Sequence, residues 1–367
     1  DDGLITMESD KASMDIPSTA VGTVTEIAVE VGAKVNEGDL VAVLEAAESE
    51  DSGSEAEVDE QPAEPSAVEP PAPATVSPPT TDDRRPASDS HTDLLVLGSG
   101  PGGYTAAFRA ADLGLKVTLV EKHATLGGVC LNVGCIPSKA LLHVGRVIEE
   151  AADLGTHGVE FGEPSVDLEK LRGFKDGVVS RLTKGLAGMA DKRAVEVVRG
   201  TGRFTSPHEL LVQGEEGETT ISFDSAVIAA GSRVVRIPGI PWDDPRVMTS
   251  TEALQLDEVP QRLLLIGGGI IGLEMAMIYG SLGADLTIVE MLPGLVPGCD
   301  ADLVKPLERR LKRRFKAKIQ LNTKVAEVRA TDEGLEAVFE GDKAPEAQVF
   351  DRVLVAVGRR PNGDRID

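Results

Sequence analysis

The sequence predicts an α/β fold with two βαβ units, preceded by part of a small all-β module and a disordered linker. Three observations lead to this prediction. A short apolar run, a Gly-x-Gly-x-x-Gly loop and a helical pattern follow one another twice, from residues 94 and 263. The second copy repeats the first at a shift of 169 residues, including the loop glycines and a closing Thr and Glu. The residues before the first copy differ sharply in composition from the rest.

The acidity of the chain is concentrated at its start. The 367 residues carry a formal net charge of -24, and residues 1–90 hold 22 Asp and Glu against 4 Lys and Arg. Nucleic-acid binding needs a basic footprint, so we expect no nucleic-acid partner. The length leaves room for two or three domains with ample core.

No segment has the pattern of a membrane span. The longest apolar run, residues 263–273, contains four glycines and is too short to cross a bilayer. No signal peptide is visible. We therefore expect a cytoplasmic protein with no membrane partner, in a reducing compartment where a cysteine pair is more often catalytic than structural.

Residues 1–47 alternate apolar and polar positions between glycine-containing breaks, which is typical of short strands in a small all-β module. Lys11 would lie at the tip of a turn between two of these strands. From spacing alone, Lys11 is equally well an ordinary solvated lysine or a modified one.

Residues 48–91 read as a linker. This stretch is rich in Ala, Glu, Ser and Pro, with eight prolines and no apolar periodicity, a composition too polar to fold. It would span about 35 Å as a flexible coil and up to about 130 Å in extended polyproline geometry. Such a reach suits a module that swings between sites.

The first βαβ unit has the pattern of a dinucleotide site. A strand at residues 94–97 precedes Gly98, Gly100 and Gly103, and a second strand ends at Glu121, 23 residues after the first glycine. The glycines let the backbone approach a pyrophosphate, and the helix N-terminus stabilises its charge. Glu121 would accept hydrogen bonds from an adenosine ribose.

The second unit has the same pattern after a strand at residues 263–266. Its loop consists of Gly267, Gly268, Gly269, Ile270, Ile271 and Gly272. A carboxylate at Glu290 would bond the free 2′-hydroxyl of NAD and repel the 2′-phosphate of NADP, so NAD is favoured. Two dinucleotide sites in one chain suggest electron transfer between two cofactors. FAD at the first site and NAD at the second is the economical assignment.

Two of the three cysteines, Cys130 and Cys135, lie in the stretch Gly-Gly-Val-Cys-Leu-Asn-Val-Gly-Cys-Ile-Pro-Ser-Lys at residues 127–139. Apolar residues recur at helical spacing after it. Both cysteines would therefore lie near a helix N-terminus, whose partial positive charge lowers the pKa of a thiol. We interpret the pair as a redox-active disulfide. The alternative is two unrelated buried thiols, because free cysteine packs like a small apolar residue.

This interpretation requires a distorted helix start. Residues five apart in an ideal helix have Cα atoms about 8.6 Å apart, which is too far for a disulfide. Gly134 and Pro137 are the residue types that permit the distortion. A strained, accessible disulfide is the labile, catalytic kind.

Other segments carry no assigned chemistry. Residues 226–232 and 351–358 are apolar runs that end in glycine turns, and Cys299 lies outside any cluster. We expect no metal site, because the histidines show no metal-ligand spacing. They are His91, placed in the linker, and His123, His143, His157 and His208.

From residue 92 onward the chain resembles the dihydrolipoamide dehydrogenases of the pyridine nucleotide-disulfide oxidoreductase family. These flavoproteins reoxidise lipoyl arms in 2-oxo acid dehydrogenase complexes. The resemblance rests on the cysteine stretch, the paired glycine loops, Ala-Ala-Gly-Ser at 229–232 and Gly-Arg-Arg-Pro-Asn at 358–362. Glutathione and mercuric reductases share the two-loop design, but the cysteine stretch is most similar to that of the lipoamide enzymes.

The N-terminal module has a resemblance of its own. Glu-Ser-Asp-Lys-Ala around Lys11 resembles the lipoylation hairpin of lipoyl domains, whereas biotin carriers flank the lysine with methionines. The resemblance implies a covalent lipoyl group on Lys11.

The resemblance implies specific site residues. Cys130 would exchange with dihydrolipoamide, Cys135 would lie against the flavin, and Lys139 would sit near the reactive flavin nitrogen, paired with Glu274. The residues implied for FAD are Gly98, Gly100, Gly103, Glu121, Lys122, Gly127, Gly128, Val129, Cys130, Lys139, Gly202 and Gly231. Those implied for NAD are Gly267, Gly268, Gly269, Ile270, Ile271, Gly272, Glu290, Val325 and Gly358.

The resemblance also implies a domain order. The expected parts are a lipoyl-type module at 1–47, a linker at 48–91, an FAD-binding domain at 92–233, an NAD-binding domain at 234–355 and a return to the FAD-binding domain at 356–367. Val129 stands where many relatives have threonine, which we expect to be harmless. We expect a fragment of a longer homodimeric polypeptide, because relatives continue into a dimerisation domain that supplies a histidine base and its glutamate partner.

The implied function is dihydrolipoamide dehydrogenase, which oxidises protein-bound dihydrolipoamide with NAD through a redox-active disulfide and FAD. Its expected partners are the lipoyl domains of 2-oxo acid dehydrogenase complexes. Two alternatives remain open. One is another disulfide reductase, of the glutathione or mercuric type, and the other is a lipoyl-bearing carrier or scaffold with an inert flavoprotein body.

Overall fold

The computed structural model describes residues 3–9, 12–17, 22–29, 42–46 and 88–366. The chain divides into two compact units, residues 1–81 and residues 82–367. The described part of the first unit is all-β, as predicted, and consists of two antiparallel pairs: β1 (Gly3–Ser9) with β2 (Ala12–Pro17), and β3 (Gly22–Ile27) with β4 (Ala42–Ala46). Lys11 and residues 48–87 of the predicted linker lie outside the described residues.

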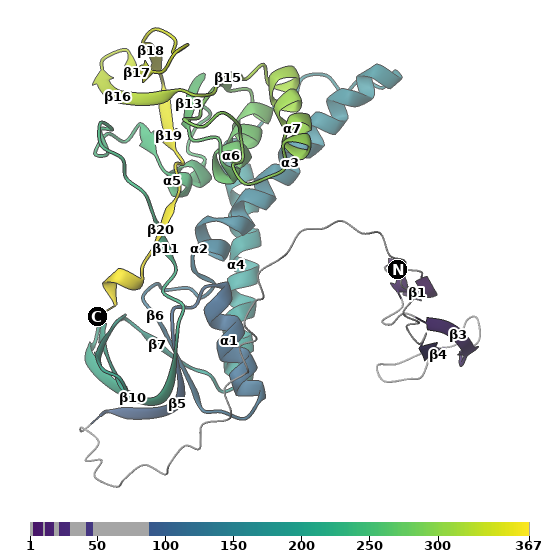
Figure 1. Ribbon diagram of the computed structural model, residues 1–367, viewed down its shortest axis with the longest axis vertical. Helices are drawn as coiled ribbons and strands as arrows, with labels where there is room; N and C mark the ends of the chain where they lie inside the picture. The colour runs from purple at the N-terminus through teal and green to yellow at the C-terminus, as the bar shows by residue number, and fades with distance from the viewer. Residues whose placement is uncertain (1–2, 10–11, 18–21, 30–41, 47–87, 367) are drawn as a thin grey trace, which may run out of the picture. The chain divides into compact units, whose positions relative to one another are not determined.

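The second unit has the predicted α/β fold and contains two large sheets (Figure 1). The first sheet has six strands in the order β7-β6-β5-β10-β9-β8. Their bounds are β5 Ser90–Leu97, β6 Val117–Glu121, β7 Glu196–Arg199, β8 Thr201–Ser206, β9 Glu209–Gly214 and β10 Gly217–Ile228. Strands β7, β6, β5 and β10 pair in parallel, whereas β10, β9 and β8 pair antiparallel. We call this sheet and helix α1 the first half.

Strand β5 begins before the predicted strand and before the predicted end of the linker. The Asp89 amide donates to the Thr220 carbonyl at 3.0 Å, and the Asp89 carboxylate accepts from the Thr220 amide at 2.8 Å. His91, which the sequence placed in the linker, therefore lies in β5. The first residues of the strand are polar, so no apolar pattern marks them.

The second sheet has five parallel strands in the order β12-β19-β13-β14-β15. Their bounds are β12 Val247–Met248, β13 Arg262–Ile266, β14 Asp285–Val289, β15 Lys318–Gln320 and β19 Arg352–Val355. A smaller antiparallel sheet packs beside it, with strands β16 Lys324–Thr331, β17 Gly334–Glu340 and β18 Gln348–Phe350. We call these sheets, with helices α5, α6 and α7, the second half.

A two-stranded ribbon connects the halves. Strand β11 (Ser232–Val234) follows the first sheet and pairs antiparallel with β20 (Arg359–Pro361), which follows the second sheet. The helices are α1 Pro101–Asp112, α2 Gly128–Val133, α3 Cys135–Asp153, α4 Leu168–Lys192, α5 Ser250–Gln255, α6 Ile270–Ser281 and α7 Ala301–Arg314. Two short 3-10 helices are η1 Leu154–His157 and η2 Gly363–Arg365.

The sequence repeat has a structural counterpart. The amide of Gly98 donates to the Val120 carbonyl at 2.8 Å, and the amide of Gly267 donates to the Val289 carbonyl at the same distance. Both glycines have positive φ, +100° and +108°, a conformation that favours glycine. Each loop therefore turns sharply from a buried strand into a helix in the same way.

Helices α3 and α4 extend the core from one half to the other. Leu141 of α3 and Leu171 of α4 belong to the apolar cluster that also contains Leu263, Leu265 and Met275 of the second half. Figure 1 shows α3 running from the region of α2 past α6 and α7. The helix that begins at Cys135 is therefore packed on both halves.

Candidate functional site

The cysteine pair lies at a break between two helices. Helix α2 contains Cys130 and ends at Val133, and α3 begins at Cys135. Gly134 between them has φ -146° and ψ -113°, which neither helix continues. A Cβ atom at Gly134 would lie 2.9 Å from the Val129 carbonyl oxygen, so the break requires glycine. The predicted distortion of the helix start is confirmed.

Both cysteines are free thiols in this structure, which is the reduced form of the predicted redox-active pair. Cys130 is half-buried against the apolar cluster of the first half, and Cys135 is exposed. The Cys135 thiol is near enough to shift the pKa of Cys130, and Cys135 itself is exposed, which argues against the alternative of two unrelated buried thiols.

The pKa of Cys130 differs from the prediction. Burial and hydrogen bonding to the Cys135 thiol raise the pKa of Cys130 to about 11, while the nearby Lys139 ammonium acts in the opposite direction. The prediction of a lowered thiol pKa at the helix N-terminus is therefore wrong for Cys130 in the dithiol form. Desolvation and a second thiol disfavour the thiolate more than the local positive charge favours it.

Lys139 of α3 forms an ion pair with the second half. Its Nζ lies 2.6 Å from Oε1 of Glu274, which is in the second turn of α6. This hydrogen bond raises the pKa of Lys139, and the two cysteines raise it further. A positive charge thus lies close to both sulfur atoms.

The first glycine loop is shaped for an anion. Gly100 is the N-cap of α1, without a side-chain cap and without an acidic residue in the first turn. A Cβ atom at Gly100 or Gly102 would meet nothing within 4 Å, so the loop backbone is open. A helix N-terminus with uncapped amides binds phosphate groups readily, and the predicted FAD contacts Gly98, Gly100 and Gly103 fit this use.

The start of α2 packs onto this loop. The Gly127 amide donates to the Ser99 carbonyl at 2.9 Å, and a Cβ atom at Gly128 would lie 2.7 Å from the Cα of Gly100. Gly127 and Gly128 both have positive φ. The structure therefore brings the cysteine stretch directly against the first dinucleotide loop.

Glu121 lies buried beside the same loop. Its Oε2 accepts hydrogen bonds from the amide and hydroxyl of Ser99 at 2.9 and 2.5 Å, and its Oε1 accepts from the His123 amide at 2.8 Å. Burial acts to raise the pKa of Glu121, but these hydrogen bonds outweigh it and lower the pKa. The carboxylate is thus ionised. A bound ribose would donate hydrogen bonds to the same carboxylate that accepts them from the loop.

The second loop repeats this arrangement. Glu290 accepts hydrogen bonds from the amides of Gly268 at 2.7 Å and Leu292 at 2.8 Å. Gly269 is the N-cap of α6, again without a side-chain cap or an acidic residue in the first turn. Ile270 is 65% exposed at the start of that helix. These features fit a second dinucleotide.

The remaining predicted cofactor contacts differ in how exposed they are. Lys122 and Val129 are exposed near the first loop, whereas Gly202 is buried in β8, where a Cβ atom would lie 2.8 Å from the Leu97 side chain. Gly231 and Gly358 lie beside the β11–β20 ribbon with open space around them.

Val325 is one of the buried predicted contacts. It is buried in the core between the small antiparallel sheet and the five-stranded sheet, with 5% of its surface exposed. Its side chain is therefore not available to a ligand, and only its backbone could take part.

Sequence reasoning missed two residues that shape the first loop. Ser99 donates two hydrogen bonds to Glu121, and the Asn132 side-chain amide donates to the Leu126 and Gly128 carbonyls at 3.1 and 2.9 Å. Asn132 lies between the cysteines, so its place in the motif was a signal that could have been used. Ser99 has no such signal, because its partner follows 22 residues later.

One cluster of metal-ligand residue types also escaped the sequence reading. Atoms of His91, Asp93 and Asp224 lie within 4.8 Å of one another, half-buried to exposed. The Nε2 of His91 is 3.6 Å from Oδ1 of Asp224. Asp224 comes from β10, far along the chain, so no sequence spacing reveals the group.

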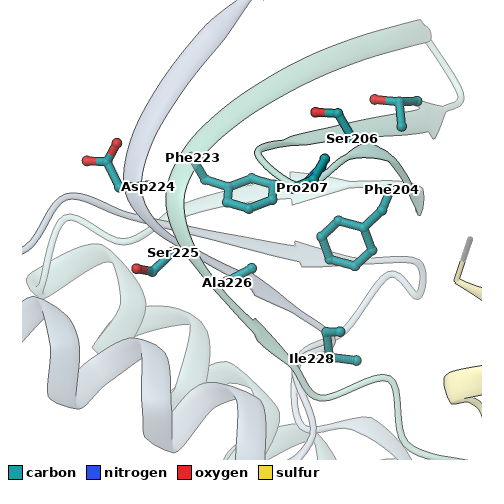
Figure 2. A pocket seen from close by; sticks show the side chains of 9 residues that line it. Phe204, Ser206, Pro207, Phe223, Asp224, Ser225, Ala226 and Ile228 are labelled. Atoms are coloured by element: carbon teal, nitrogen blue, oxygen red, sulfur yellow. The ribbon is translucent and has the colours of Figure 1, made fainter. Parts of the chain in front are cut away.

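A surface hollow lies away from the cysteines. Its volume is about 550 Å³, and Figure 2 shows its lining, which includes the rings of Phe204 and Phe223, with Ile228 at one end. The two rings meet edge to face at a centroid distance of 5.8 Å. None of the predicted site residues lines it.

Among the described residues, no helix has the length and apolar character that a bilayer span requires.

Comparison with known proteins identifies two matching family models. Residues 92–366 match the model described as pyridine nucleotide-disulphide oxidoreductase, and residues 1–44 match the model described as biotin-requiring enzyme.

Curated relatives and a solved structure match the same region. Over 275 residues the chain is 56% identical to the dihydrolipoyl dehydrogenase of Vibrio parahaemolyticus and 54% identical to that of Vibrio cholerae. Each match covers 75% of this chain but 58% of the relative, so the chain spans just over half the length of these relatives. A copper(II) complex of the HOCl-induced flavoprotein disulfide reductase RclA from Escherichia coli is similar in structure, with a TM-score of 0.65 and 28% identity over 75% of this chain and 58% of that one.

Proposed function

The chain belongs to the pyridine nucleotide-disulphide oxidoreductase family, and we propose that it forms the cofactor-binding and dithiol-oxidising part of a dihydrolipoamide dehydrogenase. The observation that carries the proposal is the position of the cysteine pair. It packs on the first dinucleotide loop through Gly128, and Lys139 joins it to α6, which begins at the second loop. The identity to dihydrolipoyl dehydrogenases supports the choice of substrate.

FAD at the first loop and NAD at the second fit the residues present. Both loops offer uncapped helix N-termini, and each has a buried carboxylate beside it, Glu121 or Glu290. The proposed FAD contacts are Gly98, Gly100, Gly103, Glu121, Lys122, Gly127, Gly128, Val129, Cys130, Lys139, Gly202 and Gly231. The proposed NAD contacts are Gly267, Gly268, Gly269, Ile270, Ile271, Gly272, Glu290, Gly358 and the backbone of Val325.

The thiol chemistry follows from sulfur exchange. In the oxidised protein, a thiolate of dihydrolipoamide attacks the sulfur of Cys130, forms a mixed disulfide and releases Cys135 as a thiolate. The second lipoyl thiolate then attacks the lipoyl sulfur of that mixed disulfide, which closes the oxidised lipoyl ring and releases Cys130. Two electrons have passed from the lipoyl group to the cysteine pair.

Protonation accompanies the second exchange. A pKa of about 11 means that Cys130 is neutral at neutral pH in the dithiol form, so its sulfur takes up a proton as it leaves. Cys135 is exposed, which leaves its sulfur open to a bound ring. The Lys139 ammonium, held by Glu274, favours negative charge on the Cys130 sulfur. FAD, when bound, supplies a two-electron acceptor that returns a hydride to NAD.

The proposed organisation of the chain follows the same assignment. Residues 92–233 with 356–367 bind FAD, residues 234–355 bind NAD, and residues 48–91 link them to a lipoyl-type module at 1–47 with its lipoyl group on Lys11. The proposed partners are lipoyl domains of 2-oxo acid dehydrogenase complexes, and the full polypeptide acts as a cytoplasmic homodimer. The match of residues 1–44 to the model for biotin-requiring enzymes supports a module with a modified lysine.

Turnover measurements test this proposal. The full-length protein, loaded with FAD, is assayed for NAD reduction with dihydrolipoamide, and for NADH or NADPH oxidation with glutathione disulfide or Hg(II). We expect turnover with dihydrolipoamide to exceed the others at least a hundredfold. Preferred turnover of glutathione disulfide or Hg(II) would assign a different reductase, and no turnover with any substrate would favour the carrier or scaffold.

A further inference from the structure

Helix α3 contacts the second half along most of its length. Near its start, Lys139 pairs with Glu274 of α6 at 2.6 Å. Further along, Gly145 lies against Ser281 of α6, and Glu149 forms ion pairs with α7. Gly145 and Glu149 are four residues apart and share one face of α3, whereas Lys139 reaches α6 from the start of the helix.

The contact at Gly145 is close enough to fix the approach of α3 and α6. A Cβ atom there would lie 2.4 Å from Oγ of Ser281 and 3.1 Å from its Cβ. Any larger residue would push the helices apart or force Ser281 to move. The two helices therefore approach closely at this point.

Glu149, one helical turn after Gly145, forms ion pairs with α7. Its side chain is only 6% exposed, and its Oε2 lies 2.6 Å from Nη2 of Arg310 and 3.9 Å from Nε of Arg314. Arg314 also donates to the backbone carbonyl of Glu149 at 2.7 Å and to Asp153 at 2.5 Å. A buried carboxylate thus meets two arginines from a single helix of the second half. We call Gly145, Glu149, Arg310 and Arg314 the α3 lock.

Helix α4 makes a second connection of the same kind. The guanidinium of Arg172 donates to the carbonyls of Leu256 and Asp257 at 3.2 Å each, and the buried Lys175 ammonium donates to the Leu254 carbonyl at 2.9 Å. These carbonyls lie at the C-terminal end of α5, where cations are favoured. Helices α3 and α4 are therefore both held to the second half by polar groups.

We propose that Glu149, with Arg310 and Arg314, is a positioning residue that sets the geometry of the cysteine pair and first dinucleotide loop relative to the second loop. This rests on the proposed function, in which electrons pass between those sites. Glu149 follows Cys135 by 14 residues, or about 21 Å along the helix. Over that length, a tilt of about 3° displaces the far end by about 1 Å, which is enough to slow a transfer step about a hundredfold.

The chemistry of the α3 lock favours a role in positioning the helices over a role in raising the stability of the fold. Burying a carboxylate is unfavourable, and a buried ion pair adds little net stability compared with an apolar contact. The Glu149 carboxylate nevertheless admits few alternative arrangements, because it is buried while its arginine partners are partly exposed, and any shift leaves it buried without them. The expected effect of weakening the ion pair is therefore altered geometry in a folded protein.

The test compares two neighbouring glutamates on α3. Glu149→Gln keeps the size of the buried side chain and removes its charge. Glu150→Gln is the matched control, because Glu150 pairs with Arg146 of the same helix and both are exposed. Each variant of the full-length protein, loaded with FAD, is mixed rapidly with NADH or with dihydrolipoamide, and flavin reduction is followed by absorbance.

In Glu149→Gln we expect the limiting rate of flavin reduction by NADH to fall about tenfold or more, with the dissociation constant of NADH changed less than twofold. Reduction by dihydrolipoamide is expected to stay within twofold of wild type, because the thiols and the first loop remain together. In Glu150→Gln both rates should match wild type. Equal rates in the two variants, or a joint loss of both reactions with loss of bound flavin, would overturn the positioning role.

Hydrogen exchange tests whether Glu149 holds α3 against α7, and it does so independently of the reaction. In the same full-length protein, Glu149→Gln is expected to raise amide exchange in residues 301–314 of α7 about tenfold, while Glu150→Gln leaves it unchanged. If NADH did not reduce the flavin of the wild-type protein at all, the proposed function would fail. The exchange result would then decide by itself whether Glu149 holds α3 against α7. Unchanged exchange in both variants would show that it does not.

Discussion

The two cysteines are five residues apart but have different surroundings. Cys130 packs against the apolar cluster of the first half, while Cys135 is exposed at the start of α3. Burial and the neighbouring thiol raise the pKa of Cys130 to about 11. In the dithiol form, the two sulfurs therefore differ in access, which suits a pair whose members meet different reaction partners.

Alkylation of the reduced protein tests this difference. Since the thiolate is the reactive species, Cys130 should react with iodoacetamide along a pH curve whose midpoint lies near 11. In Cys135→Ser the thiol that raises this pKa is gone, so the midpoint should move to lower pH. Mass spectrometry of the Cys130 peptide gives the curve, and labelling of the exposed Cys299 is the internal control. A midpoint that does not move in the variant would contradict the assigned cause.

Glu290 gives a second prediction at the same scale. Its carboxylate is buried beside the second loop and accepts hydrogen bonds from the amides of Gly268 and Leu292. Glu290→Gln removes the charge that repels a 2′-phosphate, so the preference for NADH over NADPH should fall about tenfold. Quenching of nucleotide fluorescence gives both dissociation constants. Glu121→Gln is the control at the first loop, and an unchanged preference in Glu290→Gln would refute the assignment.

At the scale of elements, the glycine loops fix the site most firmly. In each loop the last glycine lies against the backbone of the first. A Cβ atom at Gly103 would be 1.8 Å from the Gly98 carbonyl oxygen, and one at Gly272 would be 2.2 Å from that of Gly267. Helix α1 and helix α6 can therefore approach their strands only because these positions lack a side chain.

A pair of alanine substitutions in α1 tests this packing. Gly103→Ala should lower the free energy of unfolding by about 3 kcal/mol, because the new methyl group meets fixed backbone. Gly102→Ala is the neighbouring control, since nothing lies within 4 Å of its Cβ position, and it should be neutral or stabilise the helix by about 0.5 to 1 kcal/mol. Urea denaturation measures both. Equal stability of the two variants would contradict the close approach.

The elements were largely predictable where the apolar pattern is regular. Strand β6 (Val117–Glu121) ends at Glu121 as predicted, and all five of its residues are buried. Strand β5 was predicted too short, because its first residues are polar and are held by pairing with β10 rather than by burial. Long-range hydrogen bonds of this kind leave no periodic trace in the sequence.

At the scale of the whole molecule, the presence of two βαβ units could be predicted from the sequence repeat. The structure has equivalent hydrogen bonds at both copies. The candidate site was predictable as a motif but not as an environment. The raised pKa of Cys130 depends on apolar neighbours from other elements, and the burial of Val325 depends on the antiparallel sheet. The ion pairs of Glu149 join residues 161 positions apart or more, so only the fold reveals them.

Helices α3 and α4 unite the two halves, and the proposed electron path crosses this junction. One apolar cluster runs from Leu141 and Leu171 into the second half, and the polar contacts of α3 and α4 surround it. The path from dithiol to nucleotide therefore lies within a single packed body.

Anaerobic reduction of the bound flavin is the most direct test of that path. The full-length protein and its Cys130→Ser variant, both loaded with FAD, are mixed with dihydrolipoamide and then, separately, with NADH. We expect wild type to be reduced by both, and Cys130→Ser to be reduced by NADH at a rate near that of wild type but by dihydrolipoamide at least a thousandfold more slowly. Reduction of the variant by dihydrolipoamide at the wild-type rate would show that electrons reach the flavin without the cysteine pair.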